Sequence, residues 1–92
     1  MKIPELRKAL SEHGVLPRAF SIDGVDENEE QYRLEKDGKY LITYSTYYYE
    51  RGKKASLHEF INEDEACDYF LQWVLGDPTT RSKRVTLIEP KA

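Results

Sequence analysis

One cysteine and two histidines are the residues of this sequence best suited to covalent chemistry. Cys67 with His58 or His13 would form a nucleophile–base pair, because an imidazole can take the proton of a thiol and leave a thiolate. The spacing offers no third group that would orient the imidazole. Cys67 also falls on the apolar side of a predicted helix beside Asp64 and Asp68, whose negative charges disfavour a thiolate. We therefore expect Cys67 to be a buried structural residue and the protein not to be an enzyme.

Metal and cofactor chemistry finds no support in the pattern of residue types. A single cysteine excludes both an intramolecular disulfide and a zinc site built from cysteines. The sequence contains no phosphate-binding glycine loop and no recognisable spacing of metal ligands. We predict no catalytic residue, no metal ligand and no cofactor.

Tyrosines and carboxylates are the residues that suit binding. Tyr44, Tyr47, Tyr48 and Tyr49 lie in one predicted strand, in which Tyr47 and Tyr49 face one way and Tyr48 faces the other. If the sheet packs on one face, at least one of these rings is exposed, and an exposed tyrosine is a good anchor for a protein interface. The alternative is that the tyrosines reflect sheet propensity and core packing alone.

Negative charge gathers in two segments of the chain. Residues 23–35 hold six acids against one base, Arg33, and residues 59–68 hold five acids and no base. Such segments could dock a basic partner, for example a nuclease active site lined with lysine and arginine, because complementary charge speeds association. The alternative is that they are solvated loops and helix N-terminal charges, a role that already suits Glu63, Asp64 and Glu65.

The segment Glu50-Arg51-Gly52 could present a guanidinium at a loop tip, or it could be an ordinary turn in which Gly52 takes a positive φ. Tyrosines beside Arg51, Lys53 and Lys54 could also stack nucleic-acid bases, but the surrounding acids oppose that use. We therefore predict contact with a protein partner, and the expected partner-binding residues are Tyr48, Glu50, Arg51, Asp26, Glu27, Glu29 and Glu30.

Length and composition limit the class of protein. The chain has 92 residues, which is room for one domain, and 39% hydrophobic residues against 34% charged ones. That balance is too apolar for a disordered chain and too polar for a membrane protein. The net charge of −3 argues against general nucleic-acid binding. The first residues form no apolar signal segment, so we expect a cytoplasmic protein with no membrane partner.

Local patterns predict an α+β fold, in which an antiparallel sheet of three to four strands is flanked by an N-terminal and a C-terminal helix. The helices are expected at about 4–13, ended by Gly14, and at about 63–75, capped by Asn62. Asp37-Gly38 predicts a two-residue hairpin turn between strands 31–36 and 39–49, with a bulge near residues 45–46. Shorter strands are expected at 18–22 and at 55–60, the second with Leu57 pointing inward. Residues 79–92 read as a loose tail or a closing strand at 85–88, and the core candidates are Trp73, Phe70, Leu6, Leu10, Phe20 and Ile42.

Residues from about Phe20 to Leu75 resemble small immunity proteins of bacterial polymorphic-toxin systems. The resemblance depends on the order of four short segments: residues 47–52 (Tyr-Tyr-Tyr-Glu-Arg-Gly), Phe60, residues 63–67 (Glu-Asp-Glu-Ala-Cys), and residues 69–71 (Tyr-Phe-Leu). It implies a cytoplasmic, non-catalytic inhibitor that masks a toxin made by the same or a neighbouring cell. The alternative is a small homo-oligomeric or adaptor module that uses the tyrosine strand to pair with itself.

Overall fold

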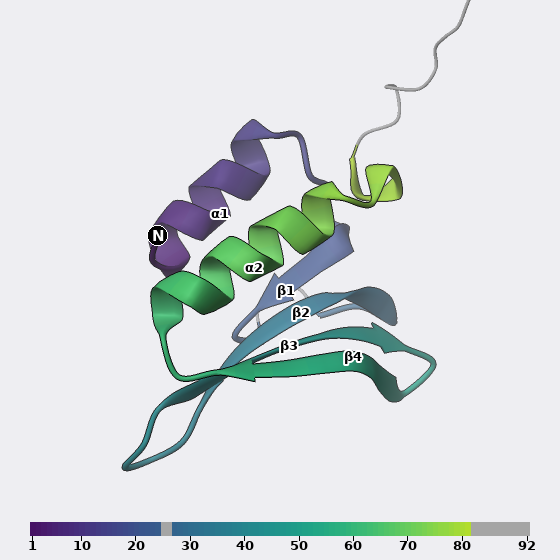
Figure 1. Ribbon diagram of the computed structural model, residues 1–92. Helices are drawn as coiled ribbons and strands as arrows, with labels where there is room; N and C mark the ends of the chain where they lie inside the picture. The colour runs from purple at the N-terminus through teal and green to yellow at the C-terminus, as the bar shows by residue number, and fades with distance from the viewer. Residues whose placement is uncertain (25–26, 82–92) are drawn as a thin grey trace, which may run out of the picture.

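A computed structural model of the chain describes residues 1–24 and 27–81. Its main elements are α1 (Ile3–Glu12), β1 (Phe20–Ile22), β2 (Glu30–Asp37), β3 (Thr43–Glu50), β4 (Lys53–Phe60) and α2 (Glu63–Leu75). Single turns of 3₁₀ helix, Pro17–Ala19 and Pro78–Thr80, follow the two helices. Both helices lie on one face of a four-stranded sheet (Figure 1). The predicted α+β class is therefore confirmed.

The helix boundaries follow from their capping residues. Asn62 accepts a hydrogen bond through Oδ1 from the backbone amide of Glu65, 3.1 Å away, and α2 begins at the next residue, as predicted. α1 begins one residue earlier than predicted and ends at Glu12, and Gly14 takes the expected left-handed conformation at φ 79°. The start of α2 and the end of α1 are therefore both set by residues within one turn of the helix.

The strand order is β1-β2-β3-β4, and the pairing of β1 with β2 is parallel. The expectation of a fully antiparallel sheet was wrong for this pair. Because β1 has only three residues, a short connection is long enough to bring the chain back to the level where β1 begins. From there β2 starts at Glu30 and runs in the same direction as β1. The remaining neighbours, β2–β3 and β3–β4, are antiparallel.

The β2–β3 hairpin has a longer loop than predicted. Asp37 pairs with Thr43, so the loop spans five residues and leaves Tyr40 and Leu41 exposed, where a two-residue turn was expected. In the observed register Leu34 pairs with Thr46, and the core gains the ring of Tyr44, which is 7% exposed. Burial of this large ring against the helices outweighs the local preference of Asp-Gly for a tight turn.

A tight two-residue turn does form between β3 and β4. Arg51 and Gly52 both have positive φ angles, 53° and 77°, as a type I′ turn requires, so the turn interpretation of this segment is confirmed. The predicted bulge is present, but it lies slightly further along and its extra residue is on β4. Tyr47 stands opposite two residues, of which Ser56 has a φ of 57°. The alternation of side chains along β3 is therefore uninterrupted.

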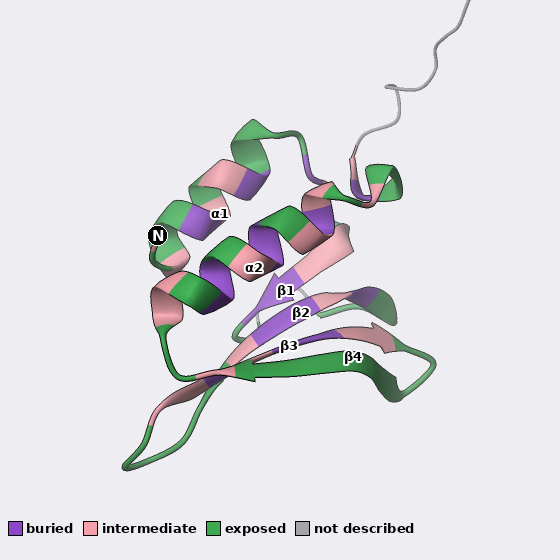
Figure 2. Cartoon of the chain, in the orientation of Figure 1, coloured by how far each residue is buried: buried purple, intermediate pink, exposed green. Residues whose placement is uncertain are grey.

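The hydrophobic core lies between the helices and the sheet (Figure 2). Leu6 and Leu10 of α1 and Phe70 of α2 are fully buried there, as predicted. Of the other three core candidates, Trp73, Phe20 and Ile42 are only partly buried against this cluster. Leu57, which was expected to point inward from β4, is 52% exposed.

The opposite face of the sheet carries a polar network centred on Arg33. Its Nε donates to Oε1 of Gln31 at 3.0 Å, one terminal nitrogen donates to the carbonyl of Asn28 at 2.7 Å, and its guanidinium lies 3.8 Å from the ring centre of Tyr49. A second terminal nitrogen is 3.8 Å from the carboxylate of Glu27. These contacts hold Glu27 and Asn28 against the sheet.

No helix within the described ranges is long and apolar enough to cross a membrane. The described chain ends just after the second 3₁₀ turn, where Arg81 forms an isolated antiparallel bridge with Val15. The closing strand considered for residues 85–88 lies outside the described residues.

Candidate protein-binding site

Five aromatic side chains form a continuous row across the helix-facing side of the sheet. We call the row formed by Tyr48, Tyr32, Trp73, Tyr69 and Phe60 the aromatic row. Successive ring centres are 4.8, 4.7, 5.8 and 5.4 Å apart, and the first two contacts are edge-to-face. Strands β2, β3 and β4 each contribute one ring and α2 contributes two. Rings in such contact hold one another in place, so the row is a rigid apolar surface.

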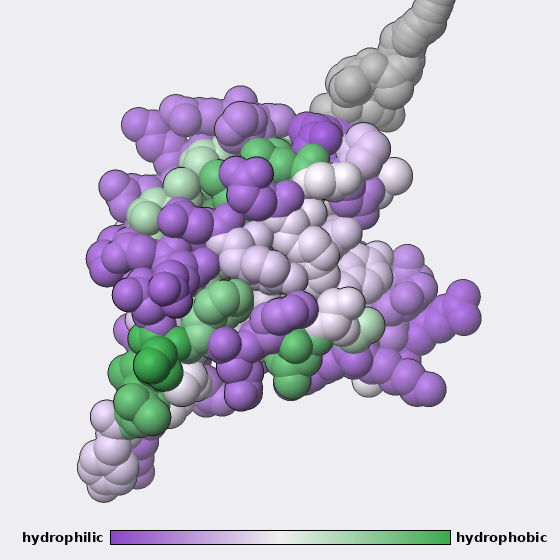
Figure 3. All heavy atoms as spheres, viewed as in Figure 1, coloured by the Kyte–Doolittle hydropathy of each residue, from purple (hydrophilic) through white to green (hydrophobic). Residues whose placement is uncertain are grey.

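The aromatic row is half-buried because the helices do not cover the whole sheet. α2 packs beside α1 and contacts β4 through Tyr69, near the end of the strand, and Figure 2 shows most of β4 exposed. Figure 3 shows pale side chains of intermediate hydropathy gathered between α2 and β4, with polar side chains around them. An exposed group of aromatic rings with a polar rim has the composition of a protein interface.

A pocket of about 180 Å³ lies at the end of the aromatic row where β2 begins. Tyr32 and Tyr48 form its aromatic wall, Glu30 and Asp77 contribute carboxylates, and Arg18 also lines it. Because Glu30 pairs with Glu50 across the β2–β3 ladder, a further carboxylate stands beside the same opening. Like charges directly opposite each other destabilise a ladder, and a cation bound between them would relieve that repulsion.

Hydrogen bonding orders the pocket wall. The hydroxyl of Tyr32 donates to Oδ2 of Asp77 at 2.8 Å, and the amide and hydroxyl of Thr79 both donate to Oδ1. Burial raises the pKa of Asp77, but the hydrogen bonds from Thr79 and Tyr32 outweigh it and hold that pKa below its usual range. Asp77 therefore stays ionised and fixes the position of the Tyr32 ring.

Tyr48 is held in its neutral form. Burial raises the pKa of its hydroxyl, and the negative charges of Glu30, Glu50 and Asp77 raise it further. The Tyr32 hydroxyl has a raised pKa as well, first from burial and then from its bond to Asp77. Neither phenol is poised to act as a base, whereas neutral rings beside carboxylates suit the binding of a cationic side chain.

Five of the predicted partner-binding residues gather at this end of the sheet: Glu29, Glu30, Tyr48, Glu50 and Arg51. Arg51 lies on the turn beside Glu29, Glu30 and Tyr49, and no carboxylate of the described residues forms an ion pair with it. Glu27 lies close by, but it is directed to Arg33. Asp26 lies outside the described residues.

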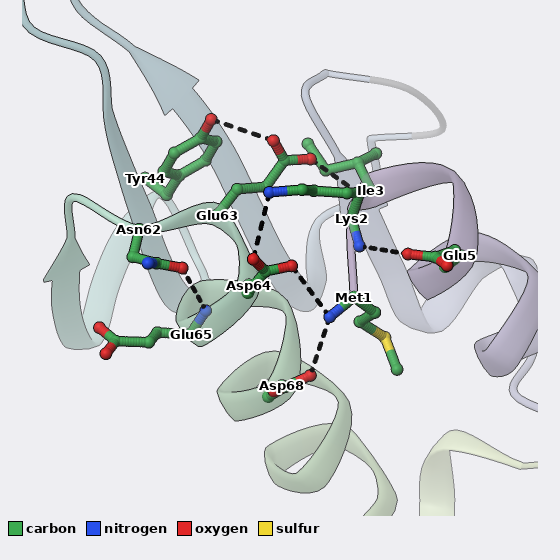
Figure 4. Close-up of polar contacts among 10 residues, drawn as sticks. All are labelled: Met1, Lys2, Ile3, Glu5, Tyr44, Asn62, Glu63, Asp64, Glu65 and Asp68. Carbon is green, nitrogen blue, oxygen red and sulfur yellow. Dashed lines mark hydrogen bonds and ion pairs between the residues drawn. The ribbon is translucent and has the colours of Figure 1, made fainter.

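The acids around the start of α2 have contacts within the chain (Figure 4). Asp64 is 3.1 Å from the α-amino group of Met1 and 3.1 Å from Nζ of Lys2, and these cations lower the pKa of its carboxyl. Glu63 accepts hydrogen bonds from the amide of Ile3 and the hydroxyl of Tyr44. Glu63 and Asp64 therefore have a structural role at the start of the helix, which was the alternative to a docking surface for this acidic segment.

Sequence reasoning missed the contribution of α2 to the site. Trp73 was assigned to the core and Tyr69 was given no role, because both fall near the apolar side of the helix. The signal available in the sequence was the width of the apolar stripe on this helix. Tyr69 and Trp73 are four residues apart, so they lie on one side of the helix and widen the stripe beyond Phe70 and Val74. Such an extension predicts aromatic side chains at the edge of the buried face.

Cys67 is buried, as expected, and burial raises the pKa of its thiol to about 11. The thiol is thus protonated and shielded at neutral pH, which does not favour nucleophilic chemistry. Within residues 1–24 and 27–81, no three histidine, cysteine or acidic side chains lie close enough together to hold a metal ion.

No protein-family model matches this sequence, and the comparisons with curated proteins and with solved structures found no match either.

Proposed function

We propose that this protein is a non-catalytic binding protein that neutralises a bacterial toxin by covering a basic surface of the toxin, as an immunity protein does. The single observation that carries the proposal is the half-exposed aromatic row, which ends at an opening flanked by Glu30, Glu50 and Asp77. Rigid aromatic rings supply contact area at a small cost in conformational entropy, and the carboxylates supply charge complementarity.

In the proposed complex a lysine or arginine of the toxin enters the pocket beside Tyr48. The face of the ring and the carboxylate of Glu30 would contact the cation together. The remaining rings of the row, above all Trp73, would cover the apolar surface around the active site of the toxin. Occlusion of that kind needs no covalent step, and we infer that it takes place in the cytoplasm.

Rescue of cell growth tests this function directly. Expression of the protein should protect cells from a toxin encoded beside its gene, and the purified proteins should form a one-to-one complex. The double variant Glu30→Lys/Glu50→Lys should slow association by about tenfold or more and reduce its dependence on salt. The control Glu12→Lys/Glu65→Lys makes the same change of charge on the helices and should leave association within about twofold.

The result against the proposal is equally clear. If no neighbouring gene product is toxic, or if a toxic one is neither bound nor neutralised, the protein is not its immunity protein. If a complex forms and the two double variants weaken it equally, the Glu30–Glu50 end of the sheet is not the binding site.

A further inference from the structure

Strand β4 is an exposed edge of the sheet. It is the last strand in the order, it pairs with β3 on one side, and no described strand pairs with its other side. Seven of its eight residues are exposed, and Phe60 is half-buried. The opposite edge, β1, has only three residues. A long open edge presents unpaired backbone amides and carbonyls, which are a template for another strand.

The register with β3 fixes which way each β4 residue faces. Pairing with Tyr44, Thr46, Tyr48 and Glu50 places four residues on the helix-facing side: Lys53, Ala55, His58 and Phe60. Pairing with Tyr49 and Ser45 places Lys54 and Glu59 on the other side. The bulge residues Ser56 and Leu57 lie midway between these two halves.

We infer that the open edge of β4 pairs antiparallel with β4 of a second copy, about a two-fold axis at the bulge. In this register each Lys54 lies opposite Glu59 of the other copy, Lys53 opposite Phe60, and Ala55 opposite His58. All six residues outside the bulge then meet a residue with the same facing, as a continuous sheet requires. The result is an eight-stranded sheet with the helices of both copies on one face.

The bulge and the charges of β4 fit this pairing. A bulge or a lysine on an edge strand usually discourages pairing, because the ladder is broken or like charges meet. Here the bulge lies on the symmetry axis. Residues 53–55 of each copy therefore pair in register with residues 58–60 of the other copy. Lys54 meets an acid, and the two-fold axis repeats that ion pair.

Two further contacts favour the same arrangement. Nζ of Lys54 lies 4.7 Å from the ring centre of Tyr47, which holds the ammonium on the face of the sheet where Glu59 lies. Leu57, exposed to 52%, lies next to the axis, where it would approach its own copy. The edge of β4 is therefore self-complementary in charge and in apolar surface. This inference does not depend on the proposed function, because β4 contributes none of the acids around the pocket and its one ring in the aromatic row, Phe60, lies on the helix-facing side and not along the open edge.

Charge exchange tests the pairing. The mass of the purified protein is measured by sedimentation from about 1 μM to 1 mM, and we expect a monomer–dimer equilibrium. Lys54→Glu alone and Glu59→Lys alone each place like charges opposite each other at both symmetric positions. Each should raise the dimer dissociation constant by about tenfold or more. The double variant Lys54→Glu/Glu59→Lys restores opposite charges and should return the constant to within about threefold of the native value.

The control Lys39→Glu makes the same charge change in the exposed β2–β3 loop and should leave the constant unchanged. Thermal unfolding of each variant shows whether loss of the Lys54–Tyr47 contact has damaged the monomer, and Glu59→Lys leaves that contact in place. A monomer mass over the whole range overturns the inference. So does a dimer that the single substitutions leave intact or that the double variant does not restore.

Discussion

Substitution of Arg33 should reveal how strongly the polar face of the sheet stabilises the fold. Arg33 is 9% exposed, and its guanidinium joins strand β2 to Asn28 and Glu27 while it also contacts Gln31 and stacks on Tyr49. Arg33→Met keeps much of the side-chain volume and removes every polar contact. We therefore expect a loss of stability with little disturbance of packing.

The contacts of Arg33 set the size of that loss. The two hydrogen bonds to Gln31 and Asn28 involve a charged donor and contribute about 1.5 kcal/mol each at the low end of their range. The stacking on Tyr49 contributes about 1 kcal/mol more, and the half-exposed pair with Glu27 contributes little. Relief from burying a charge offsets about 1 kcal/mol of this sum. The free energy of unfolding should thus fall by about 3 kcal/mol.

Urea unfolding followed by the fluorescence of Trp73, the single tryptophan, measures this change. Arg33→Lys keeps the charge but not the planar fork of the guanidinium. Its free energy of unfolding should fall by about half as much as that of Arg33→Met. Arg51→Met is the matched control, because it removes an exposed arginine and should stay within about 0.5 kcal/mol of the native protein.

Hydrogen exchange gives a second and local measurement. The amide of Asn28 donates to the same Gln31 oxygen that Arg33 holds, at 2.7 Å, so this amide should exchange faster in Arg33→Met. The network does not stabilise the sheet if two results are found together. Arg33→Met would unfold at the same urea concentration as Arg51→Met, and the amide of Asn28 would exchange at the same rate in both variants.

Three further changes should have measurable effects on stability. Asn62→Ala removes the N-cap of α2 and should lower the free energy of unfolding by about 1 kcal/mol in urea titrations, whereas Asn62→Asp should lower it by less. Because burial raises the pKa of Cys67 from 9.0 to about 11, the unfolded chain loses this proton first. Stability should therefore fall as the pH rises from 9.0 to about 11, with a smaller slope in Cys67→Ala. Gly38→Ala should lower the melting temperature more than Gly14→Ala, because both have a positive φ but only the former places Cβ against the carbonyl of Leu41.

Local chemistry explains which parts of the fold could be predicted. The boundaries of α2 were predicted to the residue because Asn62 caps one end and Gly76 ends the other, and both signals act within one helical turn. The hairpin register depends on which rings reach the core. That is decided by α1 and α2, far away along the chain, so the turn preference of Asp37-Gly38 was not sufficient. The parallel pairing of β1 is a long-range choice of the same kind.

The candidate site was predictable to the extent that it consists of exposed charge. Glu29 and Glu30 were identified because acids in such density are rarely buried, and Glu50 because it begins the segment Glu50-Arg51-Gly52 that could be exposed at a turn. The ladder then brings Glu30 and Glu50 together. The role of Arg33 was not predicted. A buried cation requires partners from residues 27–29, and only the folded connection between β1 and β2 supplies them.

The tyrosines of β3 show how one strand serves two purposes. Tyr44 and Tyr48 face the helices, where the first completes the core and the second joins the aromatic row, while Tyr47 and Tyr49 cover the polar network on the other side. β3 is bordered by β2 and β4, so it has no free edge with which to pair with itself, as the homo-oligomer hypothesis required. Strand pairing with another chain is therefore left to the two edge strands of the sheet, β1 and β4. The proposed binding site uses the helix-facing rings and the pocket, whereas the proposed dimer uses the open edge of β4, so the two proposals do not exclude each other.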